Sequence, residues 1–508
     1  MEKTQDVKTF KKPPYLMIAV LFVGAFVAFL NNTLLNVALP SIMVTFGIED
    51  FSTVQWLATG YMLVGGILVP ASAYLITKFK TRSLFLVSMA IFVVGTALAA
   101  FAPSFGVLLA GRMIQAAGAA TMSPLLMNVM LISFPVEKRG TAMGIFGLVM
   151  VLAPAIGPPL SGWIVEHYDW SVLFKMILPF AIIALLLAVW KLDNVLPNRE
   201  AKIDVFSLVL STIGFGGILY GFSTASAAGW TAIEVWGTIA IGAVGIIWFV
   251  IRQFQLEEPL LNLRIFTYPA YALASVVSMV LSVAMFSGMI LTPAYVQNIR
   301  GIEPFEAGLM MLPGAIVMGI MSPITGKLFD KFGPRILAMT GLAIATIGTI
   351  GLGYLTLDST YTFIITMYTI RMFGISMVMM PIMTNGLNAL PNRLNPHGTA
   401  MNNTAQQVAG AIGTAVLVTI FNAHTKTRAA EIVADMQANA APGAAQPTGE
   451  QLAQLEQQIM QQAMLDGITY SFFVAAGITV LAFILAAFMK RVDITKREDF
   501  TGVKPEQK

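Results

Sequence analysis

The sequence repeats itself within strongly apolar surroundings. Three residues recur 253 positions later, namely Pro40 as Pro293, Pro70 as Pro323 and Arg82 as Arg335. In the same frame ITGKLFDKFGPR (324–335) aligns with ASAYLITKFKTR (71–82), and Arg112 has a counterpart in Arg371 at an offset of 259. Internal duplication of a hydrophobic chain is typical of transporters, which build two bundles around one central site. The repeat therefore predicts two homologous bundles that move a solute across a membrane.

The composition excludes a soluble globule. The chain is 57% hydrophobic and 11% charged, whereas a soluble protein has about 25% charged residues. Its repeated apolar runs are long enough to cross the hydrocarbon core of a bilayer. Cysteine is absent, which excludes disulfides and thiolate metal sites. The net charge of +4 does not indicate nucleic-acid binding, because the basic residues fall in loops that flank the apolar runs.

The three histidines, His167, His397 and His424, are scattered near the ends of apolar runs. This distribution favours interfacial polar residues over a metal site. The first 14 residues are polar and basic, and no small-residue cleavage site follows the first apolar run. We therefore expect that run to be a retained helix and not a removed signal.

Polar breaks divide the chain into fourteen candidate spans. They lie near 15–38, 53–76, 83–102, 105–131, 141–163, 172–190, 204–224, 232–251, 270–296, 306–326, 336–356, 360–389, 398–422 and 468–489. Eight helices within the repeat offset give about 32 residues per helix and loop, which suits a span of about 20 residues better than six helices do. We therefore expect a tail at 1–14, a six-helix bundle at 15–195, two extra helices at 196–258, a second six-helix bundle at 259–491 and a tail at 492–508.

Lysine and arginine collect on one side of these spans, which places both termini in the cytoplasm. The opposite loops hold only Lys175, Arg300, Lys426 and Arg428. The segment 424–466 lies on that outer side, is rich in Ala and Gln, and is interrupted by APGAAQPTGE (441–450). Its composition leaves two interpretations open, an external hairpin of two short helices and a solvated loop.

The first span contains an unusual density of amides, in LNNTLLNVALP (30–40). Asn32 and Asn36 are four residues apart and share one helix face, with Asn31 and Thr33 on its flanks. Amides in hydrocarbon need partners, so these side chains should face the bundle interior. They either line a cavity that binds solute or water, or hold helices together. Other spans contribute further candidates for the same cavity: Gln55, Gln115, Asn402 and Gln406.

Several segments together resemble a known family. They are LNNTLLNVALP (30–40), GRMIQAAGAA (111–120), GIFGLVMVLAPAIGPPLSG (144–162), PLLNLRIF (259–266), LTPAYVQNIRG (291–301) and GKLFDKFGPR (326–335). In this order they resemble the fourteen-helix drug:proton antiporters of the major facilitator superfamily, particularly the bacterial lincomycin-resistance type, from Pro13 to about Arg491. The resemblance implies an all-α membrane protein with the major facilitator fold, two six-helix bundles plus two extra helices. It further implies polyspecific export of amphiphilic drugs across the bacterial cytoplasmic membrane, with protons as the second substrate and no cofactor.

The loop near residue 330 has the composition of a gate. Asp330 stands among Lys327, Lys331 and Arg335. A carboxylate there can accept charge-assisted hydrogen bonds from a basic neighbour or a helix N-terminus and latch the cytoplasmic side shut. The first copy has Thr77 in the acidic place and Lys80 in the glycine place, so its latch should be weaker or different.

Two further features bear on transport. By resemblance, the isolated Arg112 takes part in proton coupling; the alternative is that it snorkels to the outer interface. In 144–162, small residues such as Gly157 permit close helix packing, and Pro158 with its neighbouring prolines bends the helix. By resemblance this pattern marks exporters, which favours outward transport.

An expected carboxylate is missing. The family's first-helix motif usually begins with an aspartate, and here that place is Asn31. No acidic residue lies in the middle of a predicted span, which leaves Asp330, Glu306 and Glu137 as peripheral candidates for proton coupling. A cavity of amides, aromatics and methionines favours neutral or zwitterionic amphiphiles, and anions near Arg112.

The spans contain no Ser/His/Asp, metal-ligand or paired-carboxylate set, so we do not expect an enzyme. The alternative within transport is an exporter or flippase for one endogenous metabolite or lipid. We expect partners to be amphiphilic solutes, protons and the lipid bilayer, without nucleic acid, and we expect a monomer.

Overall fold

The computed structural model describes residues 14–48, 51–196, 204–438 and 449–493, which are helical almost throughout. Within these ranges fourteen helices are long and apolar enough to cross a membrane, and each matches one of the predicted spans. The helices are α1 (Tyr15–Phe46), α2 (Phe51–Lys78), α3 (Thr81–Ala100), α4 (Phe105–Ala119), α5 (Met122–Ser133), α6 (Arg139–His167), α7 (Ser171–Lys191), α8 (Val205–Ala228), α9 (Ile233–Gln255), α10 (Pro269–Ala294), α11 (Pro304–Phe332), α12 (Pro334–Leu352), α13 (Tyr361–Ser376), α14 (Met379–Asn388), α15 (Asn395–Ala438) and α16 (Gly449–Ala487).

The fourth and twelfth spans are each broken in two, where continuous helices were expected. The first break separates α4 from α5, and the second separates α13 from α14. Pro124 and Pro381 both stand at the third position of the segment that follows the break. Proline has no backbone N–H and its ring clashes with the carbonyl four residues earlier, so a helix is interrupted just before it. The two halves of the repeat therefore share this helix break as well as their continuous helices.

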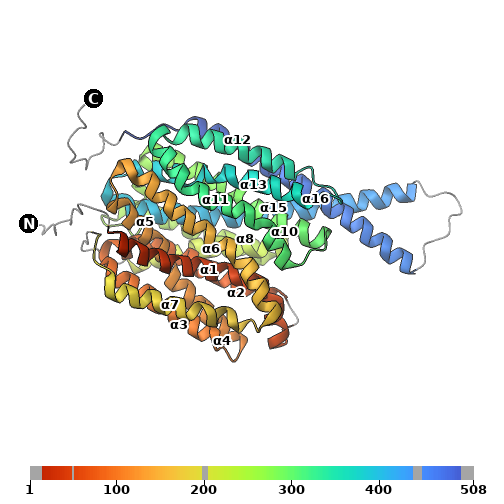
Figure 1. Cartoon of the computed structure of the whole chain (residues 1–508), viewed down its shortest axis with the longest axis horizontal. Coiled ribbons are helices and arrows are strands. Elements are labelled where there is room, and N and C mark those ends of the chain that lie inside the picture. The colour runs from red at the N-terminus through yellow and green to blue at the C-terminus, as the bar shows by residue number, and fades with distance from the viewer. Residues whose placement is uncertain (1–13, 49–50, 197–203, 439–448, 494–508) are drawn as a thin grey trace, which may run out of the picture.

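The start of α1 and the end of α16 lie at the same end of the bundle (Figure 1). This end carries the basic loops and is called the cytoplasmic end below. At the opposite end α15 and α16 continue well beyond the other helices (Figure 1). The described part of 424–466 is therefore a continuation of two spanning helices, not a separate pair of short ones. An ion pair between Arg428 and Asp466, at 2.8 Å, joins the two helices.

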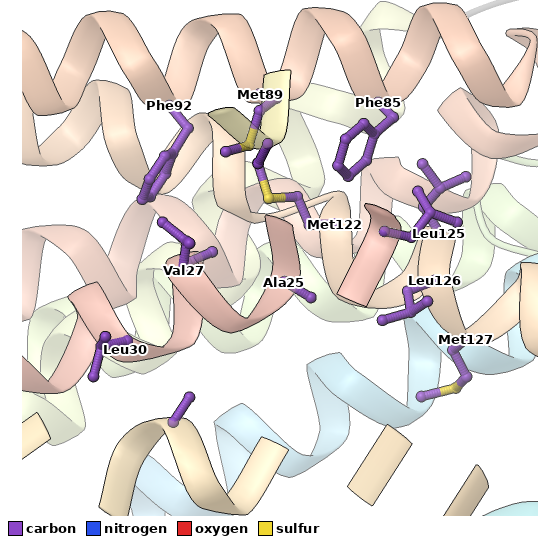
Figure 2. Close-up of a cluster of buried hydrophobic side chains, with 14 of the residues drawn as sticks. Ala25, Val27, Leu30, Phe85, Met89, Phe92, Met122, Leu125, Leu126 and Met127 are labelled. Atoms are coloured by element: carbon purple, nitrogen blue, oxygen red, sulfur yellow. The ribbon is translucent and has the colours of Figure 1, made fainter. Parts of the chain in front are cut away.

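The first bundle has a continuous apolar core between α1, α3 and α5. Figure 2 shows Phe85, Met89 and Phe92 of α3 facing Val27 of α1 and Met122 of α5. All five are buried. Because lipid tails are as apolar as these side chains, close packing rather than transfer from water holds such helices together.

The two extra helices lie across the joint between the bundles. Helices α8 and α9 pack closely at glycines; a Cβ on Gly217 would lie 2.8 Å from the Cα of Gly242. Helix α8 also contacts α2 of the first bundle and α15 of the second. The ring of Tyr220 lies 5.6 Å from that of Trp56, and Trp230 donates a hydrogen bond to Thr419. Helix α8 therefore packs against both bundles in addition to connecting them along the chain.

An ion pair fixes α8 and α9 to each other at their cytoplasmic ends. Arg252 Nε lies 2.6 Å from Asp204 Oδ2, and Arg252 Nη2 lies 3.0 Å from Oδ1. The hydrogen bond from this guanidinium lowers the pKa of Asp204 to about 2. The carboxylate therefore stays ionised at any pH at which the protein works.

Candidate functional site

Arg112 is completely buried within the first bundle, between α1, α2 and α4. Its Nη1 lies 3.1 Å from Gln115 Oε1 and 3.5 Å from the carbonyl oxygen of Asn31. Its Nε lies 3.4 Å from the carbonyl oxygen of Leu57, and its guanidinium carbon lies 4.3 Å from the ring centre of Tyr61. A cation over an aromatic face is stabilised by the ring quadrupole. The burial excludes the snorkelling alternative.

Amide side chains complete the surroundings of Arg112. Asn31 Nδ2 donates to Gln115 Oε1 at 3.2 Å, and Gln115 Nε2 donates to Thr96 Oγ1 at 2.8 Å. Asn31 and Gln115 are both buried. A polar network centred on Gln115 therefore connects α1, α3 and α4, and Arg112 is part of it. In this conformation Asn31 and Gln115 satisfy one another and the arginine instead of facing open space.

The other expected cavity residues are distributed more widely. Asn32, Gln55 and Gln406 are partly exposed. Asn402 is buried, and its Nδ2 has no hydrogen-bond partner. The side chain of Asn36 lies outside the described residues. A shared cavity of all seven amides remains a prediction.

The second bundle repeats the buried arginine. Arg371 is 1% exposed and lies between α10, α12 and α13. Its Nε lies 3.2 Å from Thr349 Oγ1, and its Nη2 lies 2.5 Å from the carbonyl oxygen of Ala284. Thr349 and Ala284 lie 253 positions after Thr96 and Asn31; Asn31 contacts Arg112 directly, and Thr96 is linked to it through Gln115. The two copies therefore place a guanidinium in equivalent frames, with amide partners only in the first.

At the cytoplasmic end, Asp330 of α11 binds the N-terminus of α6. Its Oδ1 accepts from the Gly140 N–H at 2.9 Å, and its Oδ2 accepts from the Thr141 N–H and hydroxyl at 3.0 and 2.8 Å. The first N–H groups of a helix have no partner within the helix, and its dipole attracts negative charge. This contact joins the second bundle to the first, as expected for a latch at a helix N-terminus.

The basic neighbour expected beside Asp330 is a different one. Arg335 is exposed, and the structure does not bring it to the carboxylate. Arg491 instead donates to the carbonyl oxygen of Asp330 at 2.8 Å. In the first copy Thr77 bonds the carbonyl of Ala73 in its own helix, at 2.8 Å. A hydroxyl satisfied locally cannot replace the carboxylate, so the two copies differ at this position.

Glu306 stands in the first turn of α11, at the outer end, and is exposed. Its assignment to proton coupling stays a prediction without structural support.

Two further contacts between the bundles were not expected from the sequence. Arg139 donates to Asn388 and Asn392, at 3.2 and 3.3 Å, and Asn128 donates to Thr399 at 2.7 Å. Both lie at the same end as Asp330. The sequence held one indication of the first contact, because Arg139 and Asn392 are 253 residues apart and so occupy equivalent positions of the repeat. Together these contacts close the cytoplasmic end.

Helices α6 and α11 form a close seam between the bundles. A Cβ on Gly144 would lie 2.5 Å from the carbonyl oxygen of Ser322, and one on Gly326 would collide with the backbone of Gly140. Gly157 faces Thr33 of α1 at a distance that also excludes a Cβ, and Pro158 beside it is partly exposed. Gly144 and Gly326 thus bring backbones of opposite bundles into contact, whereas Gly157 packs α6 against α1 within the first bundle.

We expect Gly144→Ala to weaken the seam. The added methyl group must displace backbone, and overpacking of this kind costs about 1–3 kcal/mol. Thermal unfolding of the solubilised protein should begin at a lower temperature, and export should decrease. Gly65→Ala is the matched control, because a Cβ there meets nothing within 4 Å. Equal melting temperatures for the two variants would contradict the close contact.

The chain is similar in sequence to known transporters. The family described as the Major Facilitator Superfamily matches residues 21–414. The lincomycin resistance protein LmrB of Bacillus subtilis (strain 168) is 42% identical, over 97% of this chain and 99% of its own. The uncharacterized MFS-type transporter YcnB of the same organism is 43% identical, over 94% and 95%. A multidrug resistance protein B homolog of Mycobacterium tuberculosis (strain ATCC 25618 / H37Rv) is 28% identical, over 78% and 74%.

Solved structures share the fold at low sequence identity. The human organic anion transporter MFSD10 (TETRAN) has a TM-score of 0.64 at 14% identity, covering 94% of this chain and 100% of its own. The proton:xylose symporter XylE bound to 6-bromo-6-deoxy-D-glucose has a TM-score of 0.59 at 13% identity, covering 94% and 96%. At such identities the likeness establishes the arrangement of helices alone.

Proposed function

The chain belongs to the Major Facilitator Superfamily of membrane transporters, and we propose that it exports drugs or other amphiphilic small molecules by alternating access. Its place is the bacterial cytoplasmic membrane, and it works as a monomer. Relatives named for lincomycin and multidrug resistance support export over import. In this proposal the two bundles rock about their centre and expose it first to the cytoplasm and then to the outside.

The observation that carries the proposal is the bond between Asp330 and the N-terminus of α6. It joins the two bundles at the cytoplasmic end, where a solute to be exported has to enter. The hydrogen bonds of a carboxylate at a helix N-terminus are strong enough to stabilise a closed state, and a small rotation of the helices is enough to break them. Because the seam of α6 and α11 runs beside it, both features act on the same movement.

A panel of toxic compounds tests the breadth of the substrate range. Deletion of the gene should sensitise cells to several unrelated amphiphiles, and expression of the full chain should restore resistance. Sensitisation to none of them, with accumulation of one cellular metabolite or lipid, would favour the dedicated exporter or flippase.

We further propose that proton antiport energises export. The family resemblance supports this coupling, and Asp330 is the carboxylate through which a proton would act on the closed state, since protonation removes its charge from the α6 N-terminus. Purified protein in liposomes should release protons when an exported compound is added, across a range of pH. Absence of such release with substrate bound would contradict proton antiport and leave export itself standing.

Asn31→Asp should shift the substrate range toward cations. The side chain lies in the network of Gln115 and Arg112, so a carboxylate there adds a negative charge beside the guanidinium. Resistance to a cationic dye should rise relative to resistance to lincomycin. Asn31→Leu, which removes the amide without adding charge, is the control and should not produce the same shift. An unchanged ratio for Asn31→Asp would show that this position does not act on substrate charge.

A further inference from the structure

The last turn of α11, which carries Asp330, ends on a backbone acceptor that the helix itself does not satisfy. In a continuing helix the carbonyl oxygen of Asp330 would accept from the N–H of the residue four positions later, but that residue is Pro334 and has no N–H. Helix α11 ends just before Gly333, whose φ of 79° turns the chain into α12. The carbonyl oxygen of Asp330 therefore needs a donor from elsewhere in the chain.

Arg491, which follows α16, supplies that donor. Its Nη2 lies 2.8 Å from the carbonyl oxygen of Asp330, and its Nη1 lies 3.5 Å from that of Lys331. The stem of the same side chain covers the turn, since a Cβ on Gly333 would lie 3.4 Å from Cδ of Arg491. A cation at a helix C-terminus is favourable because the partial charges there are negative. The arginine thus completes the turn whose side chain binds α6.

The backbone on both sides of Arg491 is fixed by one buried amide. Asn385 of α14 is 2% exposed. Its Nδ2 donates to the carbonyl oxygen of Lys490 at 3.1 Å, and its Oδ1 accepts from the N–H of Val492 at 3.2 Å. An amide that uses its donor and its acceptor on one segment fixes the orientation of that segment as well as its distance. The guanidinium therefore starts from a defined backbone position.

The corresponding segment of the first bundle, which follows α7, makes different bonds. Asn194 Oδ1 accepts from the N–H of Arg82 at 3.2 Å, and the N–H of Leu196 donates to Thr81 Oγ1 at 3.2 Å. Both partners lie in the first turn of α3, whereas Thr77, which occupies the acidic place, lies in α2. Within the described residues, the support of the helix end therefore occurs in the copy that has the carboxylate.

We propose that the backbone of residues 490–492 and the side chain of Arg491 form a brace, which sets the position of the last turn of α11 so that Asp330 meets the N-terminus of α6. Arg491 is a positioning residue, because it acts on the closed state through Asp330. The inference rests on the proposed export function and on the latch that carries it. The brace joins α11 to α14 and to the end of α16, which all belong to the second bundle. It therefore adjusts the latch without tying the two bundles together.

The test follows the opening of the cytoplasmic end directly. The chain has no cysteine, so Ser322→Cys places a single thiol in the seam of α6 and α11, where Ser322 is 3% exposed. In inside-out membrane vesicles a membrane-impermeant maleimide reaches this thiol when the cytoplasmic end opens. We expect Arg491→Ala to raise the labelling rate about two- to fivefold, as for the loss of a cation from a helix C-terminus. Lys490→Ala removes the neighbouring charge but keeps its backbone carbonyl, and it should leave the rate unchanged.

A double variant separates positioning from a general structural role. Asp330→Asn removes the latch, so adding Arg491→Ala to it should raise the labelling rate no further, whereas Arg491→Lys alone should retain most of the protection. The same increase from Arg491→Ala in both backgrounds would show that the arginine acts without Asp330 and would overturn the proposal, as would an unchanged rate in Arg491→Ala alone. Should that variant fail to insert, Asn385→Ala releases the same segment and should show the same dependence on Asp330.

Dye efflux from cells tests the export function separately. Absence of efflux from the unaltered chain, with labelling that responds to the variants as stated, would contradict export and support the brace. Efflux from the unaltered chain, with labelling that ignores Arg491, would support export and overturn the brace.

Discussion

Asp330→Asn should lower export by at least tenfold at unchanged protein abundance. The carboxylate accepts from two backbone N–H groups and a hydroxyl at the N-terminus of α6. An asparagine removes the charge and turns an NH₂ group toward one of these donors. Hydrogen bonds to charged groups contribute about 1.5–3 kcal/mol each against about 1 for neutral ones, so we expect the closed state to lose about 2–4 kcal/mol. Since every 1.4 kcal/mol is a factor of ten, the balance between the open and closed states should shift by about 30- to 700-fold.

The measurement is efflux from cells loaded with an exported dye, with immunoblotting of the membrane fraction. Lys327→Gln is the control, because it changes one charge on the same turns of α11 at an exposed position. Thr141→Val should have an intermediate effect, since it removes the hydroxyl but keeps both backbone donors. Full efflux in Asp330→Asn would show that the latch does not limit transport.

Arg112→Ala should abolish export. The substitution leaves the carbonyl oxygens of Asn31 and Leu57 and the Oε1 of Gln115 with a lost donor. Gln115 Oε1 keeps the hydrogen bond from Asn31 Nδ2, but the loss of a hydrogen bond from a charged donor costs about 1.5–3 kcal/mol, and the empty volume beside Tyr61 adds to this cost. Because these contacts join α4 to α1 and α2, we expect export to fall by at least about 100-fold, the equivalent of about 3 kcal/mol.

Arg264→Ala is the control for the loss of one positive charge, because Arg264 is exposed at the cytoplasmic end. Arg112→Lys separates charge from geometry. Lysine keeps the charge but cannot reach the same acceptors with a planar fork. Unchanged efflux in Arg112→Ala, with normal abundance, would reject a role for Arg112 in transport.

The number and places of the spans could be predicted because hydrophobic length is a local property. Runs between polar breaks identify each of the fourteen helices. The breaks in the fourth and twelfth spans were missed, although Pro124 and Pro381 occupy equivalent places. A proline inside an apolar run bends some helices and interrupts others, and neighbouring helices decide which of the two occurs.

The surroundings of a site residue could be predicted where its chemistry allows one kind of partner. An arginine in an apolar span has to find acceptors, and a carboxylate at a gate suits a helix N-terminus. The identity of the partners was not predictable. Arg335 stands five residues from Asp330 and is exposed, while Arg491, from the far end of the chain, donates to the carbonyl oxygen of Asp330. Long side chains choose partners by tertiary contact, which sequence distance does not encode.

Helix α8 touches α2 of one bundle and α15 of the other. In the alternating-access movement that we propose, α8 has to shift against at least one of the two bundles. Its contacts with α2 are close, since Gly66 of α2 meets Leu219 and Gly216 of α8 meets Ile67 with no Cβ between them. The same position covers the seam between α2 and α15. The seam of α6 and α11 is instead held by backbone contact at Gly144 and Gly326, so the two seams between the bundles are closed by different means.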